Sequence, residues 1–178
     1  MRIFVAGATG VIGRSLLPLL RDHYVVGMTR SRARLVEELG AIPVTVDAYA
    51  RDDLMRAVEA TAPEVVVNLL TDLAQRDFKA NNRIREQGAS NLLDAAVAAG
   101  ARRLVVESVD MKLPPDGAAA VEEMERSAQQ APIDAVILRF PMLWGPGTWH
   151  VEPDEAGTFM HVDEAAARVR DAIFGPND

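Results

Sequence analysis

The 178-residue sequence has no cysteine, so disulfide bonds, thiolate nucleophiles and cysteine-based zinc sites are excluded. It also lacks any apolar run approaching the ~20 residues that a helix needs to cross a bilayer. The chain begins directly with residues 2–4 and a glycine-rich turn, which leaves no room for a signal peptide. From these absences we expect a cytoplasmic protein with no membrane partner.

Positive charge is scarce as well, because 19 Lys and Arg stand against 26 Asp and Glu and the net charge is −7. Nucleic acids are bound by surfaces of net positive charge, so nucleic acid is not expected as a partner.

A metal site could be drawn from His150, Glu152, His161 and Asp163, but their spacing matches no recognised ligand motif and no metal is expected. The length fits one domain with a core of its own.

The chain is organised around its first thirteen residues. Apolar residues 3–6 end abruptly in glycine, and glycine recurs at Gly7, Gly10 and Gly13 before an apolar helix-like segment. The pattern predicts a buried strand that turns sharply into a helix, with a backbone bare enough to approach a pyrophosphate. The free N–H groups at the helix start would then face the phosphates. The alternative is a plain strand–helix turn that binds nothing.

Apolar segments of strand length alternate with amphipathic segments of helix length along the rest of the chain. Strands are predicted at residues 3–6, 24–29, 42–46, 65–70, 104–106 and 133–140, and helices at 11–21, 31–39, 52–62, 82–99, 118–130 and 163–174. Residues 141–157 are rich in Gly and Pro and are predicted to be irregular. Such a chain buries both faces of its sheet only as a doubly wound, parallel α/β layer, so we expect one Rossmann-like domain over residues 1–178.

Four segments resemble the extended and atypical short-chain dehydrogenases, the NAD-dependent epimerase/dehydratase group. Residues 7–13, Gly-Ala-Thr-Gly-Val-Ile-Gly, are similar to that family's T-G-x-x-G-x-x-G turn, and residues 88–96 to its long fourth helix. Residues 138–147 resemble its L-R-x-x-x-x-Y-G-P-G stretch, with Trp144 in place of the usual tyrosine. Residues 159–166 resemble its F-I-H-V-D-D-x-A segment. The match covers nearly the whole chain in the right order.

The resemblance assigns roles in binding a dinucleotide cofactor. The pyrophosphate would lie on the turn formed by Gly7, Thr9, Gly10, Val11, Ile12 and Gly13. Asp47, just past the third strand, would contact the adenine. The ribose and nicotinamide side would be lined by the residues that end the fourth strand, Asn68, Leu69 and Leu70.

Arg30 and Arg32 stand at the end of the second strand, where an acidic residue would favour NAD. An arginine fork matches a 2′-phosphate in charge and geometry, so we expect NADP(H) in preference to NAD(H). The alternative leaves both arginines as solvated surface residues.

The family's proton relay, a tyrosine with a lysine four residues later, is missing. The chain has only two tyrosines and two lysines, and no pair has this spacing. The family pattern places the two positions near Gly117 and Val121, which carry no acid–base group. Ser108 matches the family's serine, but a lone hydroxyl has no activating base.

Polar side chains that could substitute are few. The preferred candidates are Ser108 and Lys112, near the carboxyl end of a predicted strand, and His150 on the loop after the last strand. Further candidates near the strand ends are Glu107, Asp110 and Asp72. Histidine is the natural acid or base at neutral pH, and His150 lies on an open loop. His161 matches a family position that fixes the following helix, so we expect it to be structural.

The family's substrate-binding lobe is also shortened, because only residues 148–160 separate Gly147 from His161. We interpret residues 141–160 as the remnant of that lobe. Its aromatic residues, Trp144, Trp149 and Phe159, predict an apolar patch that forms a substrate wall or a homodimer contact.

Three functions are compatible with these features. The first is an NADP(H)-dependent reductase or dehydrogenase acting on a small carbonyl or enone, with a substitute acid. The second is a dinucleotide-binding sensor or partner module without turnover, and the third is a non-redox isomerase, lyase or cyclase that reuses the fold. The intact glycine turn and the arginines favour the first two, and we prefer the enzyme.

Overall fold

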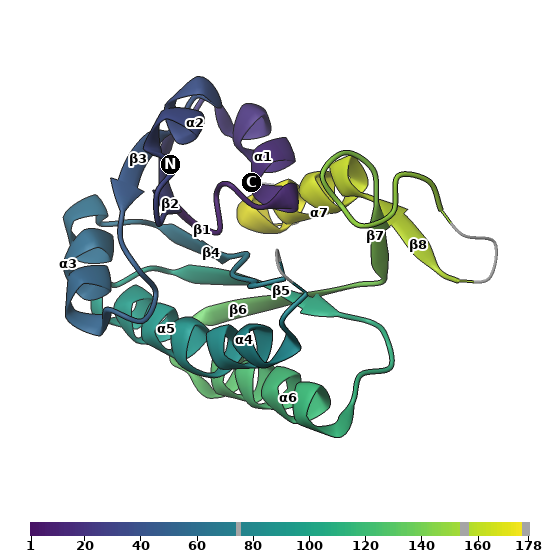
Figure 1. The fold of residues 1–178 in the computed structure, drawn as a ribbon. Coiled ribbons are helices and arrows are strands. Elements are labelled where there is room, and N and C mark those ends of the chain that lie inside the picture. The colour runs from purple at the N-terminus through teal and green to yellow at the C-terminus, as the bar shows by residue number, and fades with distance from the viewer. Residues whose placement is uncertain (74–75, 154–156, 176–178) are drawn as a thin grey trace.

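A six-stranded parallel sheet forms the middle layer of the computed structural model, which describes residues 1–73, 76–153 and 157–175 (Figure 1). The strands are β1 (Arg2–Ala6), β2 (Tyr24–Thr29), β3 (Ile42–Thr45), β4 (Val65–Asn68), β5 (Arg103–Val109) and β6 (Asp134–Phe140). Their spatial order is β3-β2-β1-β4-β5-β6, so the direction of winding reverses between β1 and β4. Open parallel sheets bind ligands outside the carboxyl ends of the strands at such a reversal. The predicted Rossmann-like, doubly wound architecture is confirmed.

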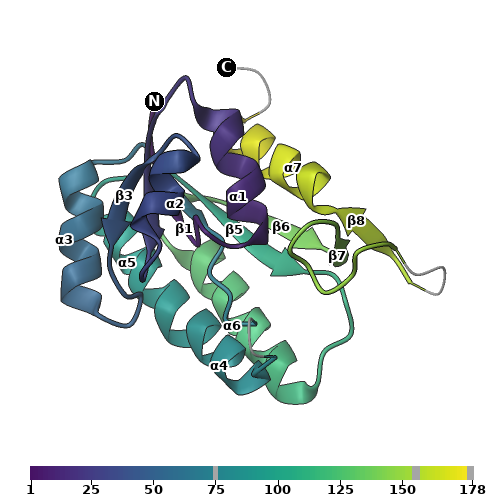
Figure 2. The same ribbon diagram turned by 45° about the horizontal axis from the view of Figure 1, so that its top comes forward.

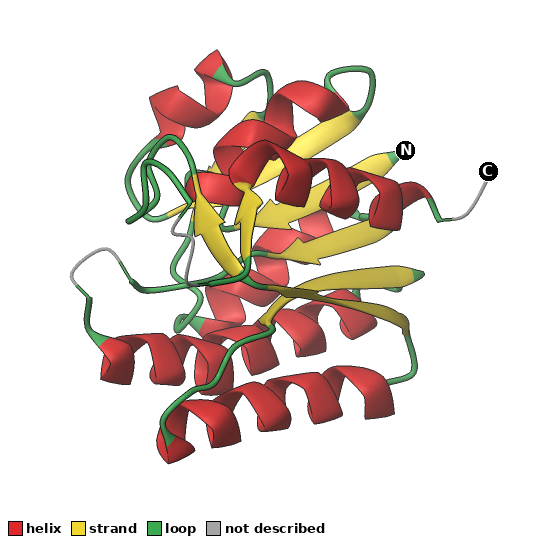
Figure 3. Ribbon diagram, turned by 90° about the vertical axis from the view of Figure 1, so that its right-hand side faces the viewer, coloured by secondary structure: helices red, strands yellow, loops and turns green. Residues whose placement is uncertain are grey.

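Helices cover both faces of the sheet (Figures 1 and 3). One layer holds α1 (Val11–Leu16) with its continuation η1 (Leu17–Leu20), α2 (Ala33–Glu38) and α7 (Val162–Phe174). The other holds α3 (Arg51–Thr61), α4 (Phe78–Arg83), η2 (Ile84–Gly88), α5 (Ala89–Ala98) and α6 (Pro115–Gln130). Figure 2 shows α1 and α7, the first and last helices, lying side by side over the sheet.

Two apolar cores result, one on each face. β4 is buried at every position, which explains why its sequence is a continuous apolar run rather than an alternating one. Alternate residues of β5 enter different cores, because Val105 packs with residues of α1 and α7 while Leu104 and Val106 pack with those of α5 and α6. This alternation fixes which side chains of β5 face which layer.

Several helices depart from the predicted boundaries; α6, for example, begins at Pro115 rather than at residue 118. Two helices show a clear local cause. The first becomes a 3-10 helix at Leu17, because Pro18 cannot donate the backbone hydrogen bond that an α-helix needs there. The helix predicted at 82–99 begins earlier, at Phe78, because the side chain of Asp77 accepts the N–H groups of Lys79 and Ala80. It also contains the π-helical turn η2, which no propensity argument anticipated.

The segment predicted to be irregular, residues 141–157, contains one short strand, and a second, also not predicted, follows it. β7 (Met142–Trp144) and β8 (Phe159–His161) pair in parallel as a small separate sheet beside the main one (Figure 3). The α7 helix begins at Val162 rather than after Asp163, because Nδ1 of His161 accepts the N–H of Asp163 at 3.3 Å. His161 therefore has the structural position that was expected for it. Among the described residues, no helix is both long and apolar enough to cross a membrane.

Candidate dinucleotide site

The turn after β1 requires glycine for packing at two positions. Gly7 has a φ of +84°, and a Cβ atom there would lie 2.3 Å from the carbonyl oxygen of Leu69. At Gly13 a Cβ atom would lie 2.5 Å from the carbonyl oxygen of Gly7. These two glycines let β1, β4 and α1 approach one another, and thereby hold the turn at the point where the sheet reverses direction.

Gly10 has a different environment. It is exposed, has an ordinary φ of −72° and stands at the N-cap of α1 without a side chain to cap the helix. No acidic residue occupies the first turn and no side chain caps it, so the described part of the chain leaves the first N–H groups of α1 for another acceptor. Arg14 follows within the same helix, with its guanidinium close against Gly147. Bare backbone, free donors and a nearby cation fit a pyrophosphate.

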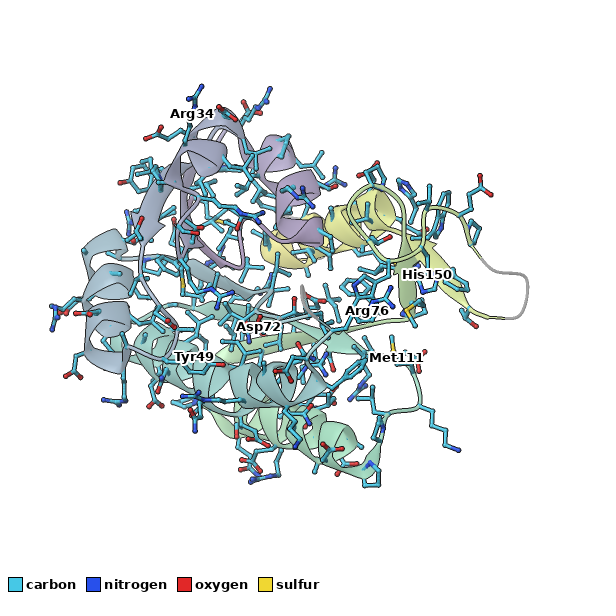
Figure 4. All side chains as sticks on the ribbon, viewed as in Figure 1. Arg34, Tyr49, Asp72, Arg76, Met111 and His150 are labelled. Atoms are coloured by element: carbon cyan, nitrogen blue, oxygen red, sulfur yellow. The ribbon has the colours of Figure 1, made fainter. Side chains whose placement is uncertain are left out.

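The two arginines predicted to bind a 2′-phosphate lie together at the end of β2. Both are exposed, and Arg30 forms an ion pair with Asp72 across 3.6 Å. The Thr29 hydroxyl accepts the N–H of Arg32 at 3.1 Å, which fixes the backbone of this loop. Arg34 pairs instead with Glu38 and lies far from His150 and the β7–β8 sheet (Figure 4).

The remaining predicted cofactor residues follow β3 and β4. Asp47 is exposed at the rim of a groove that it shares with Arg30, and its carboxylate accepts the N–H of Tyr49 at 2.9 Å. Asn68 is buried, and its side-chain oxygen accepts the N–H of Leu70 at 3.1 Å. Asn68 therefore stabilises the loop after β4. Of Asn68, Leu69 and Leu70, only Leu70 is partly exposed.

Ser108 lies on the face of β5 that packs against α6. It is completely buried, and its hydroxyl donates to the carboxylate of Glu125 at 2.5 Å. Burial raises the pKa of Glu125, but hydrogen bonds from Arg139 and Ser108 outweigh this and hold the pKa below its ordinary value. Ser108 thus has a carboxylate partner that the sequence did not reveal, in a network that ties β5, α6 and β6 together.

The other two catalytic candidates are far less enclosed. Lys112 is exposed on the loop before α6. His150 is part of the β7–β8 region (Figure 4), where its ring packs on Phe159 with 5.1 Å between centroids. Gly117 and Val121, at the family's tyrosine and lysine positions, are both buried in α6. Helix α6 therefore presents no proton donor at these positions.

An aromatic cluster joins the β7–β8 region to the loop before α4. The ring of Trp149 meets that of Phe78 edge-on at 6.2 Å, and the guanidinium of Arg76 lies 5.0 Å from the Trp149 centroid. The side chain of Phe78 is 58% exposed and that of Trp149 is 40% exposed. Of the three aromatic residues predicted to form an apolar patch, only Trp149 is exposed, and its exposed partner is Phe78, which the sequence did not indicate; Trp144 and Phe159 are half-buried.

Glu107 is the titratable group that stands out in this region, although it was only a minor candidate. The described residues give its carboxylate no hydrogen bond or ion pair, and it is largely buried. Burial raises the pKa of Glu107 to about 7, against the opposing effect of the positive charge of Arg85. Arg85 is itself buried in η2, which lowers its pKa. The sequence signal was a lone acid in the last part of an apolar strand.

These features define a Rossmann-type domain built to hold a dinucleotide. Residues 7–162 match a family model described as NAD(P)H-binding. The chain therefore belongs to this NAD(P)H-binding family.

Two curated relatives are reductases by name. The chain is 36% identical to the 3-diazoavenalumate denitrifying reductase of a Streptomyces species, over 91% of this chain and 62% of the relative. It is 30% identical to the ceramide reductase of Caulobacter vibrioides, over 82% of this chain and 47% of the relative. The chain thus spans about half to three fifths of the length of these relatives.

Solved structures share the fold at low identity. The Bordetella bronchiseptica enzyme WbmH in complex with NAD+ superposes with a TM-score of 0.80 at 19% identity, over 99% of this chain and 72% of that one. The UDP-glucose 4-epimerase of Thermus thermophilus in complex with NAD gives a TM-score of 0.79 at 18% identity, over 99% and 76%.

The two kinds of glycine in the turn can be separated by substitution. Gly13→Ala forces a Cβ atom against backbone oxygen and is expected to lower the free energy of unfolding by about 2–3 kcal/mol. Gly10→Ala should change it by less than about 1 kcal/mol, yet weaken nucleotide binding by about tenfold or more. Urea unfolding and calorimetric titration measure the two effects. Equal nucleotide affinity in Gly10→Ala and wild type would contradict the assignment.

Glu107 should make stability depend on pH. Its folded pKa lies above the unfolded value, so protonation favours the folded state, and this stabilisation is lost as pH rises through about 7. Glu107→Gln removes the penalty and should raise the free energy of unfolding at pH 8 by about 2–3 kcal/mol, with no gain at pH 4. A pH series of urea unfolding checks this. A variant less stable than wild type at pH 8 would contradict the unpaired, buried carboxylate.

Proposed function

We propose that the chain is the dinucleotide-binding part of an NADP(H)-dependent reductase acting on a small carbonyl or enone. The observation that carries the proposal is the start of α1, where uncapped N–H groups face the point of sheet reversal through a backbone without side chains. A bound reduced nicotinamide supplies hydride, so the protein has to position a substrate and provide one proton.

The names of the two curated relatives support a reductase, since both are described as reductases. The chain spans only part of each relative, so we propose the substrate class and the activity rather than taking them from the relatives' names. A cytoplasmic location likewise stays a prediction.

The preference for NADP(H) rests on charge at the end of β2. Arg30 and Arg32 provide guanidinium groups on one loop, and Asp72 pairs with Arg30 at 3.6 Å. That pair is weak because the side chain of Arg30 is 62% exposed. A phosphate dianion offers Arg30 a stronger, bidentate partner and would displace Asp72.

A binding module without turnover is the second candidate. The observation in its favour is α6, which buries Gly117 and Val121 where the family carries its tyrosine and lysine. This reading needs the same cofactor site, so it differs from the first only in the absence of a proton donor.

We further propose that residues 141–160, of which 154–156 lie outside the described residues, are the remnant of the substrate lobe, and that exposed apolar side chains of the described part form a homodimer contact. Exposed apolar side chains support this, since Trp149 at 40% exposure packs on Phe78 at 58%, and Val151 in the same segment is 80% exposed. Monomers rarely leave such side chains clustered in contact with water.

Arg30→Ala tests the cofactor preference. Loss of a charge-assisted hydrogen bond costs about 1.5–3 kcal/mol, so the Kd for NADPH should rise about 10–100-fold while that for NADH changes little. Arg34→Ala is the matched control, because Arg34 is exposed on the same loop–helix segment but pairs with Glu38. Thermal shift with each nucleotide gives the readout. An equal loss for NADPH and NADH, or an equal effect of both variants, would contradict the preference.

Light scattering tests the contact. The wild-type protein should be a dimer, and Trp149→Ser should shift it toward monomer without a large loss of stability, since Trp149 is partly exposed in the single chain. A monomeric wild type whose tryptophans react freely with a solution label would exclude the homodimer.

A further inference from the structure

The position of Glu107 in the sheet places it at the same edge as the glycine turn, two strands away from it. Ala6, Asn68, Val106 and Ile137 form one row across β1, β4, β5 and β6. The next residue after this row is Gly7 on the chain of β1, Leu69 on that of β4 and Glu107 on β5. Glu107 therefore stands two strands from Gly7, roughly 10 Å at the usual strand spacing.

The face on which Glu107 lies follows from the alternation of β5. Arg103 donates to the carbonyls of Ala172 and Ile173 in α7 at 3.2 and 3.4 Å, and Val105 packs in the core of α1 and α7. Glu107 is the next residue of this series and faces the same layer. That layer contains α1, whose free N-terminus begins the dinucleotide site.

The surroundings leave Glu107 without a fixed partner. β4 and β6 place Leu69 and Leu138 beside it, and α7 turns apolar residues such as Val162 and Ala165 toward the sheet. Arg103, on the same face, is engaged with Asp134 and with α7. Among the described residues, the one charge that acts on Glu107 appreciably is Arg85 of η2.

We propose that Glu107 is the acid that replaces the missing tyrosine and lysine, and that it protonates the substrate in the reduction. This inference rests on the proposed function. Two other candidates are less suited. Ser108 faces the opposite layer and its hydroxyl donates a hydrogen bond to Glu125, and Lys112 is exposed on the loop before α6. An acid whose pKa is near 7 holds its proton for transfer at physiological pH.

The step balances for a carbonyl substrate. The π bond of the carbonyl breaks, its carbon gains hydride from the reduced nicotinamide, and its oxygen gains the proton from the carboxyl of Glu107. The products are an alcohol, the oxidised nicotinamide and a glutamate carboxylate. Because Glu107 is not completely enclosed, water can return the proton.

The test measures the protonation of Glu107 directly and needs no substrate. Protein labelled with ¹³C at glutamate side-chain carboxyls is titrated by NMR in two complexes, one saturated with NADPH and one with NADP+. Glu107→Gln and Glu125→Gln assign the two resonances. The oxidised ring is positively charged and the reduced ring is neutral, so a carboxyl beside the ring should titrate about one pH unit or more lower with NADP+.

Glu125 is the matched control, since it lies on the opposite face of β5 and is held by Arg139. A difference between the two complexes for Glu107, with none for Glu125, supports the proposal. Equal midpoints for Glu107 in two complexes that both form would overturn it and leave the proposed function standing. Absence of any resonance or melting-temperature change with either nucleotide would overturn the proposed function itself.

Discussion

The structure depends on how closely three backbones meet after β1. Gly7 lies against the carbonyl of Leu69, and Gly13 lies against the carbonyl of Gly7, at distances that no side chain tolerates. This contact places the start of α1 at the carboxyl ends of β1 and β4, between which the direction of winding reverses. The direction of the helix, its free N–H groups and the neighbouring end of β5 are all positioned by it.

Much of the fold could be predicted because it depends on local sequence. Burial of β4 on both faces requires an unbroken apolar run, and the glycine spacing at Gly7, Gly10 and Gly13 permits few other conformations. The exceptions are weak local signals. β7 and β8 are three residues each and pair with one another over a long separation, so no period in either segment identifies them.

The site was predictable only in part, for a related reason. In the proposed site, phosphate would be bound by backbone, which glycine marks in the sequence, whereas proton transfer would need side chains that only the fold brings together. Ser108 and Glu125 are seventeen residues apart yet share a hydrogen bond, and Arg85 influences Glu107 from a helix in the other layer. The burial that raises the pKa of Glu107 is a property of the assembled layers, which a single sequence does not display.

The π-helical turn η2 carries a consequence for how this chain varies. Such a turn accommodates one more residue than an α-helix of the same rise, and each residue of an α-helix turns by about 100°. Arg85 lies within this turn and is buried there together with Ile84 and Gly88. A single-residue deletion there would re-aim the guanidinium without disturbing the strands. A relative with one residue more or fewer in this helix would therefore place its guanidinium differently and change the pKa of the carboxyl group at the end of β5, while the strands keep their positions.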